Sequence, residues 1–154
     1  SLSQRISLFL AQLFLSTNTG SMGNVNVLKP DDRIYMTDNV AALRQLLLSA
    51  PRDALPMTYQ QVASALALTP PRTIAQVTQA LEQLMREDAA QQKPFIAALV
   101  VSRRGGDLPA AGFFELAVTL GRFPADTAQH EAAYRVEFQG ALDERENADK
   151  NAQP

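Results

Sequence analysis

The stretch that decides the fold runs over residues 57–85 and reads MTYQQVASALALTPPRTIAQVTQALEQLM. It holds two amphipathic patterns with a turn between them. Thr58 is a favoured helix N-cap, and Gln61 three residues later completes the pattern of a capping box. The short first helix would then bury one face, formed by Val62, Ala63 and Leu66.

A second and longer helix is predicted after the ALTPP turn. Pro71 stands at the favoured first-turn position of that helix. Apolar residues then recur with the spacing of one helix face, at Ile74, Val77, Leu81, Leu84 and Met85. The other face carries Arg72, Thr73, Gln76, Gln79, Gln83 and Arg86. Two helices joined by a turn predict a helix-turn-helix whose second helix is the recognition element.

The flanking segments extend this pattern. Residues 39–50 predict a helix with Thr37 or Asp38 as its N-cap, and Ile34, Tyr35 and Met36 would form a short strand or extended lead-in. Residues 95–102, FIAALVVS, form an apolar run of strand length and predict a buried strand. The loop RRGGDLPAAG follows, with a tight turn at Gly105-Gly106, and then a helix over residues 113–121 that ends at Gly121. This order of elements is that of a winged helix-turn-helix.

Both ends of the chain are predicted to add helices to this core. Apolar residues at helical spacing over residues 2–14 predict an amphipathic helix, with a poor signal-peptide h-region as the alternative. Residues 127–144, TAQHEAAYRVEFQGALDE, predict another helix, with fraying or disorder after Asp143 and a solvated His130. The expected fold class is therefore α+β and mainly helical. Its expected parts are an N-terminal helix and linker (1–29), a winged-helix-like domain (30–125) and an acidic helical or disordered tail (126–154).

The segment TYQQVASALALTPPRTIAQVTQAL resembles the T/S-Y-x-Q-L/I-A … R-A-V-G-x-A-L/M segment of alkylguanine-DNA alkyltransferases and alkyltransferase-like proteins. KPFIAALVVSRRGGDLPAAG extends the similarity to Gly112, over the strand and glycine-rich wing of that family. The resemblance implies a winged-helix domain that binds the DNA minor groove and flips a nucleotide. It implies that Tyr59 helps to rotate the nucleotide and that Arg72 fills the gap left in the base stack.

The chain departs from this family where the chemistry is done. Phe95, Ile96 and Ala97 stand where the family has Cys, His and Arg. Without a nucleophile or a base to activate it, alkyl transfer is excluded. The whole chain has no cysteine and one histidine, which excludes thiolate and multi-histidine metal sites. Neighbouring carboxylates such as Glu87 and Asp88 do not share a helix face, so no catalytic residue, metal or cofactor is expected.

The charge balance limits how the chain would contact nucleic acid. Its formal net charge is −2, whereas proteins that coat DNA without specificity are strongly basic. Residues 51–106 hold six basic and four acidic residues, a local excess of +2. Any contact with DNA must therefore come from a local patch. The candidate nucleic-acid-binding residues are Tyr59, Arg72, Thr73, Gln76, Gln79, Arg103 and Arg104.

The predicted function is that of a non-catalytic winged-helix protein that binds DNA, as a regulator or a DNA-structure binder. The alternative is a protein–protein interaction module on the same scaffold with no nucleic-acid role. In that case Tyr59 packs with its hydroxyl on the backbone, and the arginines are ordinary surface residues. An enzyme with an unrecognised site is a third hypothesis. The partners expected are DNA and a second copy bound through the N-terminal helix, with no membrane. The lack of cysteine fits a cytoplasmic protein.

Overall fold

The computed structural model describes residues 32–104 and 106–152, so the predicted N-terminal helix and linker lie outside the described residues. The described elements are α2 (Asp32–Ser49), β1 (Met57–Thr58), α3 (Tyr59–Ala65), α4 (Thr73–Ala90), β2 (Val100–Val101), α5 (Ala111–Thr119) and α6 (His130–Ala152). Short 3₁₀ helices cover Arg52–Ala54, Ile96–Leu99 and Thr127–Gln129. The predicted mainly helical α+β class is confirmed.

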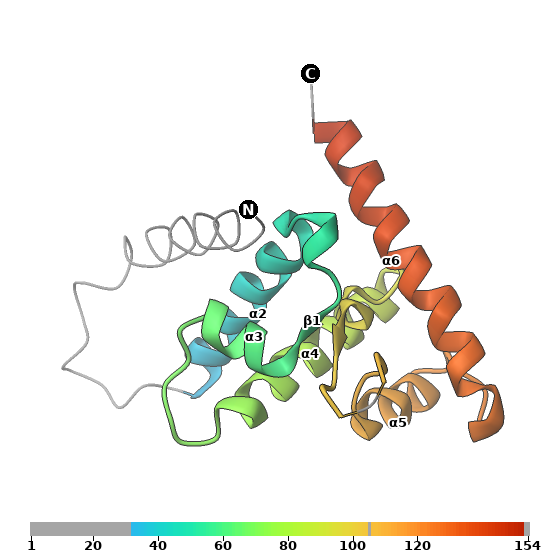
Figure 1. The fold of residues 1–154 in the computed structure, drawn as a ribbon, viewed down its shortest axis with the longest axis horizontal. Coiled ribbons are helices and arrows are strands. Elements are labelled where there is room, and N and C mark those ends of the chain that lie inside the picture. The colour runs from blue at the N-terminus through green and yellow to red at the C-terminus, as the bar shows by residue number, and fades with distance from the viewer. Residues whose placement is uncertain (1–31, 105, 153–154) are drawn as a thin grey trace.

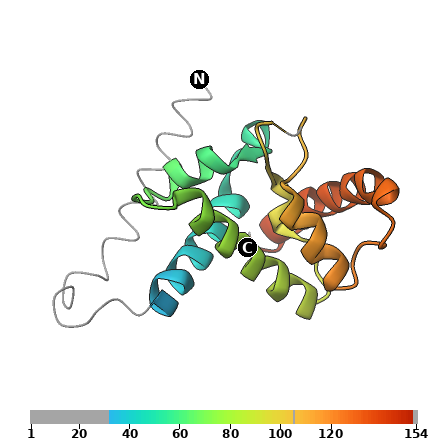
Figure 2. The ribbon, with the colours of Figure 1, turned by 90° about the horizontal axis from the view of Figure 1, so that it is seen from below.

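The helices surround a small parallel sheet and the segment that leads into it. β1 and β2 pair in parallel, with Met57 opposite Val100 and Thr58 opposite Val101. Figure 1 shows α2, α3 and α4 on one side of this sheet and α6 on the other, with the C-terminal end of α6 projecting beyond the body. Figure 2, seen from below, shows α5 between α4 and α6. Segment 95–101 lies at the centre and is buried throughout.

The capping box at the start of α3 is confirmed. The Gln61 N–H donates to Thr58 Oγ1 at 3.1 Å, and the Thr58 N–H donates to Gln61 Oε1 at 2.9 Å. The expected first-turn role of Pro71 is wrong, because α4 begins at Thr73. Arg72 takes a left-handed conformation with φ of +60°, so regular helical geometry starts only after it.

The lead-in predicted at Ile34, Tyr35 and Met36 is also wrong, because these residues lie inside α2. The two predicted caps, Thr37 and Asp38, lie inside the same helix. The helix buries Leu43, Leu46 and Leu47 in the core that it shares with α4. Tertiary packing of an apolar face supplies most of the stability of a helix. Local cap signals therefore did not decide where α2 begins.

Only the end of the predicted strand over residues 95–102 is a strand, because residues 96–99 form a 3₁₀ helix. Side chains from other elements hold its backbone groups. The Phe95 N–H donates to Glu137 Oε2 at 2.6 Å, and the Ile96 N–H donates to Asp88 Oδ2 at 3.0 Å. The Tyr134 hydroxyl donates to the Ala98 carbonyl at 2.8 Å. Buried backbone groups must find partners, and here these side chains take the place of a neighbouring strand.

An arginine neutralises each of the two carboxylates. Arg44 Nη1 lies 2.8 Å from Asp88 Oδ1, and its Nη2 lies 3.1 Å from Glu87 Oε1. Arg122 Nη1 lies 2.7 Å from Glu137 Oε2, and its guanidinium carbon lies 4.3 Å from the centre of the Phe95 ring. A buried carboxylate needs such a partner, because its desolvation is otherwise unfavourable.

The expectation of fraying after Asp143 is wrong, because α6 continues to Ala152. Arg145 donates from Nη2 to the carbonyls of Leu48 and Ala50 at the C-terminal end of α2. Cations are favoured at that end of a helix, where the last carbonyls lack intrahelical partners. This contact holds α6 against the end of α2 at Arg145, and the helix projects beyond the body after it (Figure 1).

Aromatic rings fill the space between α5 and α6. Phe113 is buried and makes edge-to-face contacts with Phe95 and Tyr134, as expected for a core residue. His130, predicted as a solvated residue without a partner, is partly exposed but contacts two neighbours. Its ring stacks on Phe114, with centroids 5.5 Å apart, and its Nε2 lies 2.8 Å from the Pro124 carbonyl. These aromatic contacts fix the start of α6.

We predict that Asp88→Asn lowers the free energy of unfolding by about 3 kcal/mol, because it leaves Arg44 without its buried partner. The Asp88 carboxylate is 2% exposed and contacts both Arg44 and the Ile96 N–H. Glu87→Gln is the matched control, because Glu87 contacts the same arginine from a side chain that is 39% exposed. It should cost less than about 1 kcal/mol. Equal losses in urea unfolding would contradict this account.

We also predict a loss of stability at alkaline pH that depends on Tyr134. Burial raises the pKa of the Tyr134 hydroxyl, which donates a hydrogen bond to the Ala98 carbonyl. The unfolded chain ionises this group near its ordinary pKa of about 10, but the folded chain does not. The free energy of unfolding of the wild type should therefore fall more steeply above about pH 10 than that of Tyr134→Phe. Parallel curves in urea titrations over this range would contradict the prediction.

Candidate nucleic-acid interface

The turn before α4 holds Arg72 in an exposed and strained position. Its φ and ψ are +60° and 42°, which costs a residue with a Cβ atom about 1–2 kcal/mol. The Gln76 amide fixes the turn by donating to the carbonyls of Thr69 and Pro71, each at 3.1 Å. Strained residues that the surrounding structure retains are concentrated at functional sites. Arg72 therefore stands out among the candidate residues.

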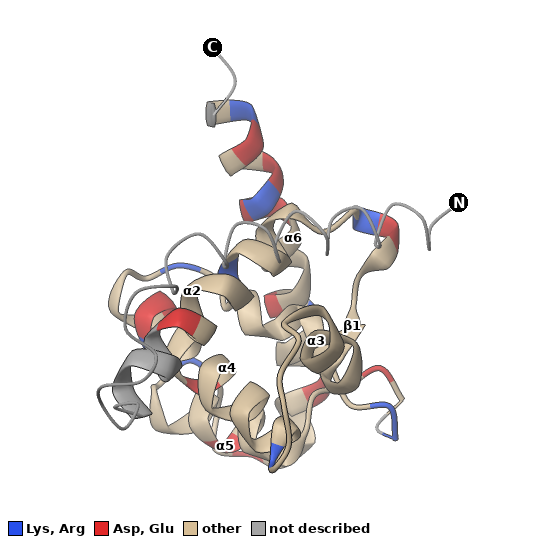
Figure 3. Ribbon diagram, turned by 90° about the vertical axis from the view of Figure 1, so that its left-hand side faces the viewer, with Lys and Arg blue, Asp and Glu red and all other residues tan. Residues whose placement is uncertain are grey.

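The loop between β2 and α5 carries two more exposed arginines. The Ser102 N–H donates to the Leu108 carbonyl at 2.8 Å and closes the loop at its base. Arg103 and Arg104 lie in the turn that follows Ser102. Gly106 has a φ of +60°, as a turn at the predicted Gly105-Gly106 pair requires, whereas Gly105 lies outside the described residues. In Figures 1 and 3 this loop and the turn before α4 lie on the same lower side of the molecule.

The arginines divide into two groups by their partners. Six of the arginines whose side chains are described bind a carboxylate or backbone carbonyls, namely Arg44, Arg52, Arg86, Arg122, Arg135 and Arg145. Arg72, Arg103 and Arg104 have no carboxylate partner within the described part of the chain. These three are the arginines that the sequence proposed as DNA contacts.

The surface around α3 and the start of α4 is almost free of charge. Residues 54–81 contain one charged residue, Arg72. Figure 3 shows α3 facing the viewer without a charged residue. The first acid of α4 is Glu82, which lies 3.9 Å from Arg86. An approaching anion therefore meets no carboxylate on the first turns of α4.

The other candidate residues have different surroundings. The Tyr59 hydroxyl is half-buried and accepts a hydrogen bond from the Ala110 N–H at 2.9 Å, and burial raises its pKa. Thr73 is half-buried at the first position of α4. The Gln76 amide is engaged in the turn, whereas Gln79 is exposed. Ile74, predicted on the buried face, is 39% exposed, because it lies at the end of α4, beyond the core.

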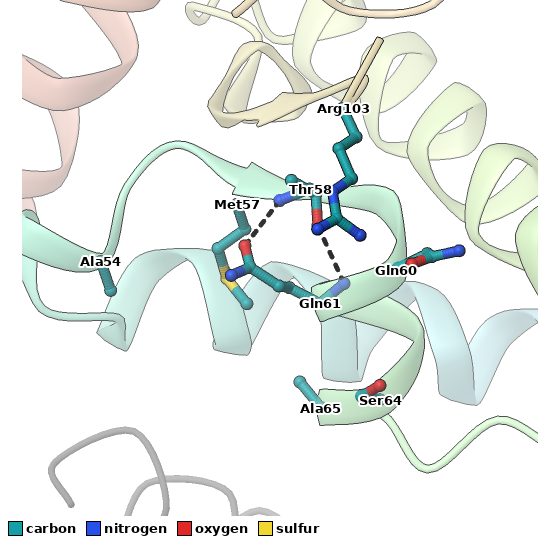
Figure 4. Close-up of a pocket in the computed structure, with 8 residues that line it drawn as sticks. All are labelled: Ala54, Met57, Thr58, Gln60, Gln61, Ser64, Ala65 and Arg103. Carbon is teal, nitrogen blue, oxygen red and sulfur yellow. Dashed lines mark hydrogen bonds between the residues drawn. The ribbon is translucent and has the colours of Figure 1, made fainter. Parts of the chain in front are cut away.

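Sequence reasoning missed a shallow groove between α3 and the arginine-bearing loop. The groove has a volume of about 480 Å³, and Arg103 extends over it toward Thr58 (Figure 4). Its other lining residues are neutral, namely Ala54, Met57, Gln60, Gln61, Ser64 and Ala65. Gln60, Gln61 and Ser64 are polar residues on the outer side of the predicted short helix. Their position was the only feature of the sequence that could have indicated the groove. The groove extends the uncharged surface up to the loop.

Comparison with protein-family models, curated proteins and solved structures found no match to this chain. Among the described residues, none of the helices is long and apolar enough to cross a membrane. Over the same part of the chain, no group of three or more metal-ligating side chains comes together.

We predict that Arg72→Gly is more stable than Arg72→Ala by about 1 kcal/mol. Both variants remove the guanidinium, but only glycine adopts the left-handed conformation without strain. Thermal or urea unfolding of the two variants measures the difference. If the alanine variant were as stable as the glycine variant, the turn before α4 would not impose the strained conformation.

Proposed function

We propose that this chain is a non-catalytic DNA-binding protein of the winged-helix type. In this proposal the start of α4 enters a groove of the duplex, and Arg103 and Arg104, in the loop after β2, contact the sugar–phosphate backbone. The observation that carries the proposal is that Arg72, Arg103 and Arg104 have no carboxylate partner in the described part of the chain, whereas the other described arginines are bound.

Unpaired arginines suit phosphate binding because no existing ion pair has to break. Each phosphate that a cation neutralises releases counterions from the duplex, which makes the affinity depend on salt. Three such arginines and a net charge of −2 predict modest affinity and a shallow salt dependence. Residues 54–81 contain no Asp or Glu, which supports placing this face against the duplex. Carboxylates there would repel the DNA phosphates.

The surroundings of Phe95 and Ile96 support binding without alkyl transfer. These residues take the places of the cysteine and histidine of the alkyltransferases that the sequence resembles. Both are buried, and their N–H groups donate to Glu137 and Asp88. The segment thus forms part of the core, and no nucleophile stands in it.

One observation favours a second candidate, a protein–protein interaction module. The surface formed by residues 54–81 carries one charge, and the centres of protein interfaces are depleted in charged residues. Interfaces with DNA are much more positive. In this alternative a protein partner binds this face, and the three arginines do not bind phosphate.

Fluorescence anisotropy with a labelled duplex of random sequence, titrated with salt, tests the first proposal. We predict that Arg72→Ala, Arg103→Ala and Arg104→Ala each weaken binding, and that each reduces the slope of log K against log salt by about 1. Arg135→Ala is the matched control, because it removes the same charge from α6, where Arg135 is paired with Glu131. It should leave the slope unchanged.

No binding at low salt with protein at about 10–100 μM would contradict the proposal, because non-specific DNA affinity reaches that range even at physiological salt. Equal effects of Arg135→Ala and Arg72→Ala would contradict the assigned face, because binding would then follow net charge alone. The interaction module would be the remaining candidate in the first case.

A further inference from the structure

A stripe of exposed residues runs along the first half of α4, formed by Ala75 and Gln79, with the exposed Arg72 in the turn just before the helix. Residues three and four positions apart lie on the same face of a helix. The opposite face of α4 is buried through Val77 and Leu84. The stripe therefore points away from the core, and Arg72 stands at its beginning.

Only one of the glutamine amides of α4 is free to bind a partner. The Gln76 amide donates to the carbonyls of Thr69 and Pro71. The Gln83 amide donates to Glu87 Oε2 at 3.4 Å. Gln79 is exposed and makes no side-chain hydrogen bond in the described part of the chain. It is the residue of this stripe that can recognise a polar edge through both a donor and an acceptor.

The chemistry of Ala75 and Gln79 matches an A·T pair. In the major groove, a glutamine amide pairs with N6 and N7 of adenine, and an alanine methyl group packs against the thymine methyl group. The usual partner of the cytosine amino group is a carboxylate, and α4 has none before Glu82. Ala75 and Gln79 are separated by about 6 Å along the helix axis, and base pairs by about 3.4 Å. The two side chains thus reach pairs one or two steps apart.

We propose that α4 reads A·T pairs in the major groove, with Gln79 on adenine and Ala75 against a thymine methyl group. This inference rests on the proposed DNA-binding function and adds a sequence preference to it. Arg72, at the N-terminal end of the stripe, contacts the adjacent DNA backbone.

Anisotropy titrations with four duplexes of equal length test this preference. One duplex has an A·T-rich centre and one a G·C-rich centre. Two further copies of the A·T duplex carry 7-deazaadenine for adenine, which removes the N7 acceptor, or uracil for thymine, which removes the methyl group. Both changes alter the major groove alone. The proteins are the wild-type chain, Gln79→Ala, and Gln83→Ala as the matched control.

The wild type should bind the A·T duplex about five- to 100-fold more tightly than the G·C duplex. Each modified duplex should lose a large part of that advantage. Gln79→Ala should bind the A·T and 7-deazaadenine duplexes equally, because it has no amide to lose a partner. Gln83→Ala should behave as the wild type does. Alanine is a strong helix former, so both variants should remain folded.

Equal binding of all four duplexes by the wild type would overturn the inference and leave the DNA-binding proposal intact. A preference for A·T that survives both base changes would also overturn it, because the reading would then take place in the minor groove. No binding to any duplex by any of the proteins would overturn the DNA-binding proposal, and the inference with it.

Discussion

The rest of the structure depends on the two contacts of the buried Asp88 carboxylate. It lies in the last turn of α4, binds Arg44 of α2 through one oxygen and accepts the Ile96 N–H through the other. One buried group thus joins two helices to the segment that leads into β2. Glu137 makes the equivalent contact from α6, on the neighbouring Phe95 N–H, with Arg122 as its cation. Two carboxylates, one from α4 and one from α6, therefore accept hydrogen bonds from the N–H groups of two consecutive residues.

These contacts determine which parts of α4 and of the loop after β2 lie on the surface. The C-terminal end of α4 is fixed in the core, so its N-terminal end projects with the turn that Gln76 stabilises. β2 leaves the same central segment and leads directly into the loop that carries Arg103 and Arg104. The acidic residues of α4 lie in its second half, where Arg44 and Arg86 pair with them. The proposed DNA-binding face is the part of α4 from which these charges are absent.

The sequence predicted the features that are encoded locally. Thr58 and Gln61 predict the start of α3, and Gly121 predicts the end of α5, where its φ is +78°. Ala67 and Gln92 adopt the same left-handed conformation after α3 and α4, but neither residue type signals it. The apolar run over residues 95–102 predicts a strand, but half of it forms a 3₁₀ helix whose first N–H groups bind side chains. One of these side chains, Glu137, lies 42 residues from Phe95 in the sequence, so local periodicity could not predict the contact. The candidate arginines were predicted from position, but only the fold reveals that the other described arginines are bound.

The central claim is that the start of α4 and the loop after β2 form one DNA-binding face. Its most direct test is a map of backbone amide NMR shifts as an unlabelled duplex of random sequence is added to the isotope-labelled chain. The account predicts shifts concentrated in residues 72–79 and 102–107, with the amides of α6 unchanged. Shifts centred on α6, or an unchanged spectrum at about 100 μM duplex and low salt, would contradict it.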